Sequence, residues 1–242
     1  MGRLDRPVPV SPEITAETEI VLIGGRVDAD SLVAGYREGL FPMEVDLAQE
    51  EPREVGPEGA PTEASEQESS AASLLAWFCP DPRGVLAYPG MRVSRSLRRA
   101  QNQFTVTVDE DFAGVLEGCA DPYRPHGWIT PAYREAYLDL HTLGIAHSVE
   151  VWQQGQLAGG LLGLELGGTF CADSKFHRVT NASKVALAEL SRRVFGGADA
   201  PARLIDVQWC TDHLASLGCR EVSRAEYLRT MPARLALPTV LS

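Results

Sequence analysis

Residues 147–174 read HSVEVWQQGQLAGGLLGLELGGTFCADS. Three largely apolar runs, HSVEVW, LAGGLLGLEL and TFCADS, are separated by the short glycine-containing segments QQGQ and GG. Short turns with glycine join neighbouring antiparallel strands, and apolar runs bounded by such turns are typical of strands. The stretch therefore predicts an antiparallel meander of three strands.

Strands and helices alternate on both sides of this meander. The predicted helices span residues 29–38, 94–101, 110–118, 131–143 and 183–195, and the predicted strands span 85–88, 104–109 and 202–210. The first helix is capped by Asp30 or Ser31, the second by Ser94 and the fourth by Thr130. This order predicts an α+β fold with a central mixed, largely antiparallel sheet covered by helices.

An acidic stretch interrupts the first part of the chain. Between Glu44 and Glu68 nine acidic residues stand against the single base Arg53, a net charge of −8, so the chain's total of −11 leaves only −3 elsewhere. Residues 45–72 are rich in Glu, Pro, Gly, Ser and Ala and predict a disordered insertion. We expect a small N-terminal domain over 1–82 that contains it, and a larger domain over 83–242.

Composition argues against several classes of protein. The sequence has no apolar run of the roughly 18 residues that a membrane span needs, and its start lacks the apolar segment of a secretory signal. Its five cysteines form no C-x-x-C pair, which gives neither a zinc motif nor a disulfide framework. A cytoplasmic protein without a membrane partner or a metal is expected. A nucleic-acid partner requires the remaining bases to cluster.

Ten short strings occur in an order that resembles the leucyl/phenylalanyl-tRNA-protein transferases over nearly the whole chain. They are GLFP (39–42), WFCPDPRGVL (77–86), SRSLRR (94–99), GWIT (127–130), LHTLGIAHSVEVW (140–152), LAGGLLG (157–163), FCADSKF (170–176), NASKVAL (181–187), LIDVQ (204–208) and HLASLG (213–218). The resemblance implies a small N-terminal domain followed by an acetyltransferase-like (GNAT) domain, with no metal and no bound cofactor.

The resemblance also implies a reaction. An apolar aminoacyl group passes from aminoacyl-tRNA to the N-terminal amine of a protein that begins with a basic residue, a modification that marks the protein for degradation. The donor ester is already activated, so the enzyme mainly has to align the amine and the ester and stabilise the oxyanion. The absence of G-x-S-x-G and H-E-x-x-H motifs agrees with such a reaction.

Asp206 and Gln208 match the catalytic pair proposed for the resembled family. They stand two apart in a predicted strand, so both side chains are expected on one face of the sheet. In this reading the Asp206 carboxylate polarises the Gln208 amide, and the amide carbonyl accepts a hydrogen bond from the attacking amine. Spacing alone predicts no more than the polar face of a strand.

Asp173 stands where the family usually has a glutamate that meets the basic first residue of the acceptor. Lys175, two residues later, replaces an apolar residue that is usual in the family. The alternative for this pair is a surface salt bridge, worth roughly 0–1 kcal/mol.

The resemblance assigns two further sets of residues. A pocket for the donor side chain is implied at Met43, Trp128, Leu161, Phe170, Leu190 and Val194, for each of which ordinary core packing is the alternative. Contacts with tRNA are implied at Arg95, Arg98 and Arg99, and at Tyr36 and Tyr137, whose rings would lie near the terminal adenosine. Three arginines in a short helix are otherwise a solvated face, and a buried core is the commoner place for a tyrosine.

Three other functions compete with this one. An acyl-CoA transferase would use a phosphate loop, but RVFGGA (193–198) falls at the end of a predicted helix, where the dipole repels phosphate. A small-molecule amine, such as an antibiotic intermediate, could replace the protein acceptor. The chain departs from the resembled family in donor and acceptor recognition at Met43, Asp173, Lys175 and the segment 102–103. A catalytically inactive binding module is disfavoured by the intact Asp206 and Gln208.

Overall fold

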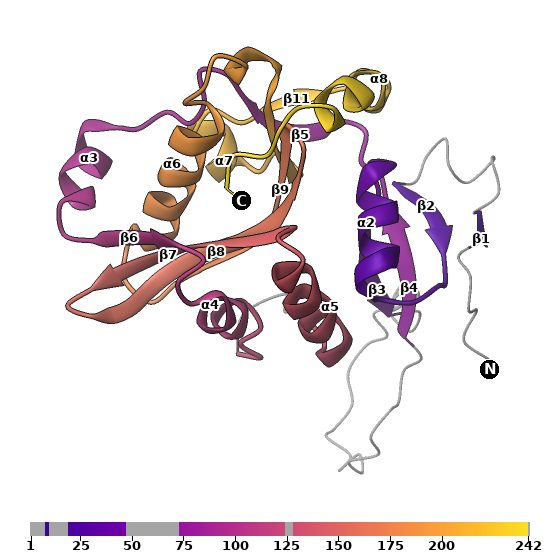
Figure 1. Cartoon of the computed structure of the whole chain (residues 1–242), viewed down its shortest axis with the longest axis horizontal. Coiled ribbons are helices and arrows are strands. Elements are labelled where there is room, and N and C mark those ends of the chain that lie inside the picture. Colours follow the sequence, from indigo (N-terminus) through magenta and orange to yellow (C-terminus); the bar gives the residue numbers. More distant parts are fainter. Residues whose placement is uncertain (1–7, 10–18, 47–72, 124–127, 242) are drawn as a thin grey trace, which may run out of the picture.

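The computed structural model describes residues 8–9, 19–46, 73–123 and 128–241, and places them in two sheets with helices around them (Figure 1). The smaller sheet has the strand order β1-β2-β4-β3. Its strands are β1 (Val8–Pro9), β2 (Ile20–Ile23), β3 (Phe41–Asp46) and β4 (Ser73–Phe78).

The larger sheet has the strand order β11-β5-β10-β9-β8-β7-β6. Its strands are β5 (Arg83–Ala87), β6 (Thr105–Val108), β7 (Ala146–Gln153), β8 (Gln156–Leu166), β9 (Thr169–His177), β10 (Leu204–Gln208) and β11 (Arg220–Val222). Strands β7, β8 and β9 form the predicted antiparallel meander, and β9 and β10 run parallel. The prediction of an α+β fold with a mixed, largely antiparallel sheet is confirmed.

The helices begin and end within two residues of the predicted bounds wherever a helix was predicted. They are α2 (Ala29–Arg37), α3 (Arg95–Gln101), α4 (Phe112–Cys119), α5 (Pro131–Thr142), α6 (Ala182–Val194), α7 (Asp212–Ser216) and α8 (Arg224–Leu235). Ser94 caps α3 as predicted, through a bond from the Leu97 amide. The predicted cap of α2 was wrong, because Asp28 accepts the Ser31 amide at 2.8 Å.

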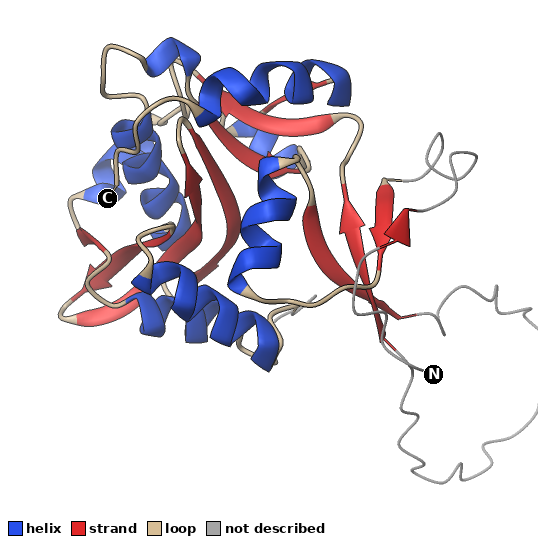
Figure 2. Ribbon diagram, turned by 45° about the vertical axis from the view of Figure 1, so that its right-hand side comes forward, coloured by secondary structure: helices blue, strands red, loops and turns tan. Residues whose placement is uncertain are grey.

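Helices cover both faces of the large sheet. Figure 1 shows α6 on one side of β7 and β8, and α4 and α5 on the other. Because side chains alternate along a strand, Leu161 of β8 packs in the core beneath α6, while its neighbour Leu162 packs beneath α4 and α5. Figure 2 shows the same layers from another side, with the small sheet beside them.

Strands β3 and β4 bracket the acidic stretch. Val45 and Asp46, predicted as the first residues of the disordered insertion, instead lie in β3 and pair with Leu74 and Ser73. The rest of the insertion, 47–72, lies outside the described residues. Since β4 belongs to the small sheet and β5 to the large one, the chain passes from one sheet to the other between Phe78 and Arg83.

Within the ranges described, no helix is long and apolar enough to cross a membrane. The same residues contain no group of three or more His, Cys, Asp or Glu side chains that could hold a metal ion.

Candidate active site

A cavity of about 340 Å³ opens between the small sheet and the large one. Its walls are mostly apolar and come from both sides: α2 and β3 of the small unit, and β8, β9, α6 and the end of β10 in the large unit. Gln208 and Asp173 bring polar groups to this cavity. Such a space suits an apolar ligand group that must meet a few fixed polar groups.

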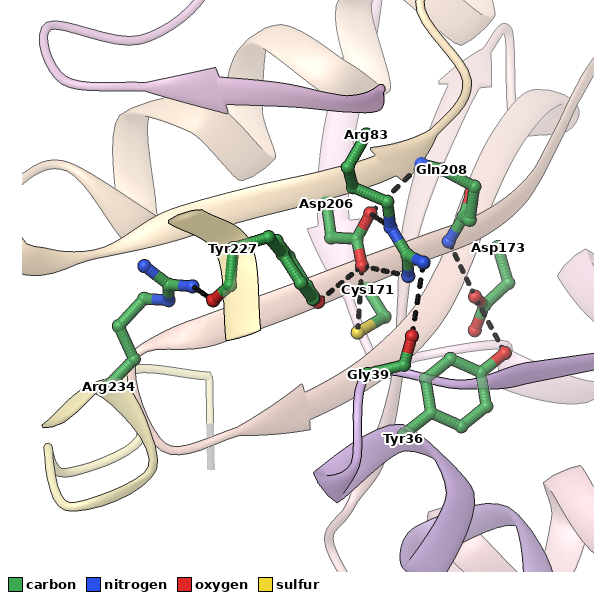
Figure 3. Close-up of polar contacts among 9 residues, drawn as sticks. All are labelled: Tyr36, Gly39, Arg83, Cys171, Asp173, Asp206, Gln208, Tyr227 and Arg234. Carbon is green, nitrogen blue, oxygen red and sulfur yellow. Dashed lines mark hydrogen bonds and ion pairs between the residues drawn. The ribbon is translucent and has the colours of Figure 1, made fainter. Parts of the chain in front are cut away.

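Asp206 does not reach the cavity but is held in a buried ion pair. Arg83 donates to both of its carboxylate oxygens, at 2.9 and 2.6 Å, and the two side chains are 1% and 0% exposed (Figure 3). The Tyr227 hydroxyl donates a further bond at 2.7 Å. Burial by itself raises the pKa of Asp206, but Arg83 and these hydrogen bonds hold it below its ordinary value. Asp206 is therefore an ionised group inside the protein.

Arg83 also ties the small unit to the large one. Its third contact is a bond from Nη1 to the Gly39 carbonyl at 3.1 Å, just after α2. Its guanidinium lies 5.0 Å from the Phe41 ring centroid and 4.7 Å from that of Tyr227. One side chain thus connects β5, β10, α8 and the turn between α2 and β3.

The backbone between Asp206 and Gln208 is irregular. The pairing of β10 with β5 shifts register there, and Gln208 has a φ of 61°. The regular alternation from which we expected the two side chains on one face does not extend through this step. Asp206 instead accepts the main-chain N–H of Gln208 at 2.9 Å. Asp206 fixes the backbone that carries Gln208 and makes no bond to its side-chain amide.

The side-chain amide of Gln208 is bound by Asp173. Its Nε2 donates to Asp173 Oδ1 at 3.1 Å (Figure 3), which leaves the amide carbonyl Oε1 as the acceptor. The expectation that Asp206 polarises this amide was wrong: in the structure the carboxylate on the amide is that of Asp173.

Two tyrosines hold the Asp173 carboxylate. Tyr36 and Tyr137 each donate a hydroxyl bond to it at 2.9 Å. Burial raises the pKa of Asp173 to about 7, against the effect of these hydrogen bonds and together with the nearby Asp206 charge. Because the Tyr137 side chain is 0% exposed, its ring has no open face for an adenine, and the predicted role of Tyr137 in stacking is wrong. Tyr36 borders the cavity, but its hydroxyl is used on Asp173.

The predicted donor pocket is divided by the structure. Met43, Trp128 and Leu161 line the cavity. Phe170, Leu190 and Val194 do not line it but pack in the core between α6 and the large sheet, as the alternative interpretation predicted. The apolar residues that line it and that sequence reasoning missed include Leu187, Val207 and Leu214. In the sequence each of them is only an apolar residue beside a predicted polar or helical position. Such a residue can line a cavity or lie in the core, so the sequence does not tell the two apart.

The arginines of α3 are exposed and separate from the cavity. Arg95, Arg98 and Arg99 all face solvent, and none lines the cavity. A second hollow of about 340 Å³ lies beside α3, and its lining includes the bases Arg92 and Lys184 and no acidic residue. Basic residues therefore lie near α3 in addition to the three predicted arginines. Their distance along the sequence did not indicate that Lys184 would lie close to this helix.

Comparison with known proteins identifies the family. Residues 85–232 match the leucyl/phenylalanyl-tRNA protein transferase family. A leucyl/phenylalanyl-tRNA--protein transferase of Azoarcus sp. (strain BH72) is 41% identical over 233 residues, which cover 92% of this chain and 86% of that protein. One of Azotobacter vinelandii is 38% identical over 235 residues, covering 96% and 92%. The chain belongs to the leucyl/phenylalanyl-tRNA protein transferase family. It is an aminoacyltransferase, as the resemblance of its sequence motifs predicted.

One solved structure shows a low likeness to the chain. A protein of unknown function from Bacteroides thetaiotaomicron VPI-5482 aligns with a TM-score of 0.37 and 15% identity, over 66% of this chain and 57% of that one. This likeness is too low to assign the transferase a fold family.

Arg83 and Tyr227 belong to the transferase's buried network around Asp206, and neither was predicted from the sequence. Arg83 lies inside the string WFCPDPRGVL, where a lone arginine beside an apolar strand was a signal for a buried ion pair. Tyr227 gave no such signal, because a tyrosine on an amphipathic helix is most often a core residue. Both contact Asp206 across long sequence separations.

Proposed function

We propose that this aminoacyltransferase moves an apolar aminoacyl group from aminoacyl-tRNA to the N-terminal amine of a protein that begins with a basic residue. The observation that carries the proposal is the amide of Gln208, fixed by Asp173 so that its carbonyl is the remaining acceptor beside an apolar cavity. The names of the relatives, which carry both tRNA and protein, support it.

The chemistry assigned to this site is aminolysis of an ester. The amine nitrogen forms a bond to the ester carbonyl carbon, the bond from that carbon to the ribose oxygen breaks, and the proton lost by the nitrogen ends on that oxygen. Gln208 Oε1 orients the amine by accepting a hydrogen bond from one of its N–H groups, since an amide is too weak a base to remove the proton. No covalent intermediate with the enzyme is required.

The surrounding residues take supporting roles in this proposal. Asp173 orients the Gln208 side chain, and Asp206 orients its backbone through the ion pair with Arg83. Met43, Trp128 and Leu161 form part of the wall that receives the aminoacyl side chain, and a wall with methionine and leucine adapts to several apolar shapes.

The tRNA and the architecture complete the proposal. Arg95, Arg98 and Arg99, exposed on α3, contact phosphates of the tRNA. The mixed, largely antiparallel sheet supports an acetyltransferase-like domain over 83–242, next to a small domain over 1–82. The five cysteines of the described residues form no disulfide bond, which supports a cytoplasmic location. Nothing in the cavity or the comparisons favours a small-molecule acceptor.

The test is transfer from Leu-, Phe- and Met-tRNA to peptides that begin with Arg or Lys, with wild-type enzyme and two variants. Gln208→Ala removes the acceptor atom and should lower turnover by about 10²-fold while charged-tRNA affinity stays unchanged. Gln208→Glu keeps an oxygen acceptor, so it should retain more activity than Gln208→Ala. Absence of transfer with every charged tRNA, or full turnover of Gln208→Ala, would contradict the proposal.

A further inference from the structure

Trp209 directly follows Gln208 and borders the cavity. Its side chain lines the cavity, yet the residue remains 36% exposed. Phe41 and Phe78 meet the indole at near-perpendicular angles of 89° and 70°, with centroids 5.0 and 6.1 Å away. The ring is thus held in place by aromatic packing while part of it stays open to a ligand.

A carboxylate adjoins this ring. The indole Nε1–H donates to Glu19 Oε2 at 2.8 Å, from the residue just before β2. Among the described parts of the chain, Glu19 forms no ion pair and its Oε1 accepts no hydrogen bond. An aromatic ring beside an available carboxylate is a combination that binds arginine and lysine side chains, through the ring quadrupole and through charge-assisted hydrogen bonds.

Asp173 is poorly suited to binding the basic first residue of the acceptor, the role that the sequence suggested for it. Three donors already occupy its carboxylate, two tyrosine hydroxyls and the Gln208 amide. Its pKa of about 7, raised mainly by burial, means that it carries only part of a negative charge at neutral pH. Two of these donors bind Oδ1 and one binds Oδ2, so the carboxylate, with about four acceptor sites, has little capacity left for a basic side chain.

We propose that Trp209 and Glu19 bind the basic first side chain of the acceptor protein. This assignment rests on the proposed transfer to a protein N-terminus and names the group that selects its first residue. The α-amine of that residue must reach Gln208, so its side chain needs a binding surface one residue away. Trp209 is that neighbour, and Glu19 supplies the charge.

Gly84 allows the main chain of Trp209 to lie close to β5. A Cβ at Gly84 would lie 2.5 Å from the Cys210 amide nitrogen and 2.6 Å from the Trp209 carbonyl carbon, so only glycine allows β5 to approach the end of β10 this closely. The main chain that carries Trp209 is therefore closely packed against β5, which favours a fixed binding surface.

The experiment compares peptides that begin with arginine or with citrulline, its uncharged isostere. Glu19→Gln should reduce the preference of kcat/KM for arginine over citrulline about tenfold, as expected for the loss of one charge-assisted contact. Trp209→Leu should raise the KM for the arginine peptide, with the KM for charged tRNA unchanged. Trp209→Phe keeps a ring and should retain most of the preference. Glu221→Gln, an exposed acid on β11, is the matched control and should change nothing.

The possible outcomes distinguish a failure of this inference from a failure of the proposed function. If wild-type enzyme transfers normally but both Glu19→Gln and Trp209→Leu keep the full preference for arginine, the site is elsewhere. If Trp209→Leu raises only the KM for charged tRNA, the ring contacts a nucleotide base of the donor tRNA, and the inference is overturned as well. If wild-type enzyme transfers to no peptide from any charged tRNA, the proposed function itself fails. Thermal unfolding of each variant shows whether a loss comes from misfolding.

Discussion

The carboxyl of Asp173 is expected to titrate within the working range of the enzyme. Its pKa of about 7 means that it gains its full negative charge only above neutral pH, and the ionised form is the one that accepts the Gln208 amide. We predict that the turnover of wild-type enzyme rises through a transition near pH 7, and that Asp173→Asn lacks this transition. Rate profiles for both proteins with one acceptor peptide check this, because the titration of the peptide amine is common to both. Identical profiles would exclude Asp173.

The ion pair of Arg83 and Asp206 is expected to stabilise the fold only while both of its members are present. Removing one member leaves the other charged and buried, so Arg83→Met should lower the free energy of unfolding by about 3–5 kcal/mol in urea denaturation. In the double variant Arg83→Met with Asp206→Leu no buried charge remains, and much of that loss should be recovered. A loss below about 1 kcal/mol in the single variant would show that water reaches Asp206. Because Asp206 also holds the Gln208 backbone, transfer by the double variant should stay impaired.

At the scale of single elements, a substitution that disturbs the close approach of β5 to the end of β10 should lower the free energy of unfolding. Gly84→Ala places a Cβ against backbone atoms that cannot rotate away, so we predict a loss of about 1–3 kcal/mol in the free energy of unfolding and a lower turnover. Gly197→Ala is the control, since its Cβ would meet only the end of the Asp199 side chain, at 3.0 Å. Equal effects of the two substitutions would contradict the argument.

The helix α3 is expected to carry the electrostatic part of tRNA binding. Each phosphate contact that is lost should lower the slope of log affinity against log salt by roughly 0.7–0.9. Arg99→Ala should therefore weaken binding and flatten its salt dependence, while Arg229→Ala, an exposed base on α8, should do neither. If the triple variant of Arg95, Arg98 and Arg99 binds with unchanged affinity and slope at low salt, the polyanion lies elsewhere.

At the scale of the whole molecule, the acidic stretch is predicted to be dispensable for the fold. Asp46 and Ser73 are paired across β3 and β4, so residues 47–72 can be replaced by a two-residue Asn-Gly turn of the kind that joins antiparallel strands. We predict a melting temperature and a transfer rate at saturating tRNA that match those of the full chain, measured by calorimetry and by the peptide assay. A large fall in either would show that the stretch packs on the body of the enzyme.

The sequence by itself determined the family, the three-stranded meander predicted over 147–174 and most helix bounds, because each depends on residues close together in the chain. Turn glycines, caps and apolar periodicity act over a few positions, and the ten strings only had to occur in order. Only the tertiary structure decided which carboxylate meets the Gln208 amide, which predicted pocket residues are core, and that Arg83 neutralises Asp206. Those contacts join residues 35 and 123 positions apart, and β10 loses its alternation between Asp206 and Gln208. Periodicity carries no information about partners at such distances or about the side to which an irregular strand turns its next residue.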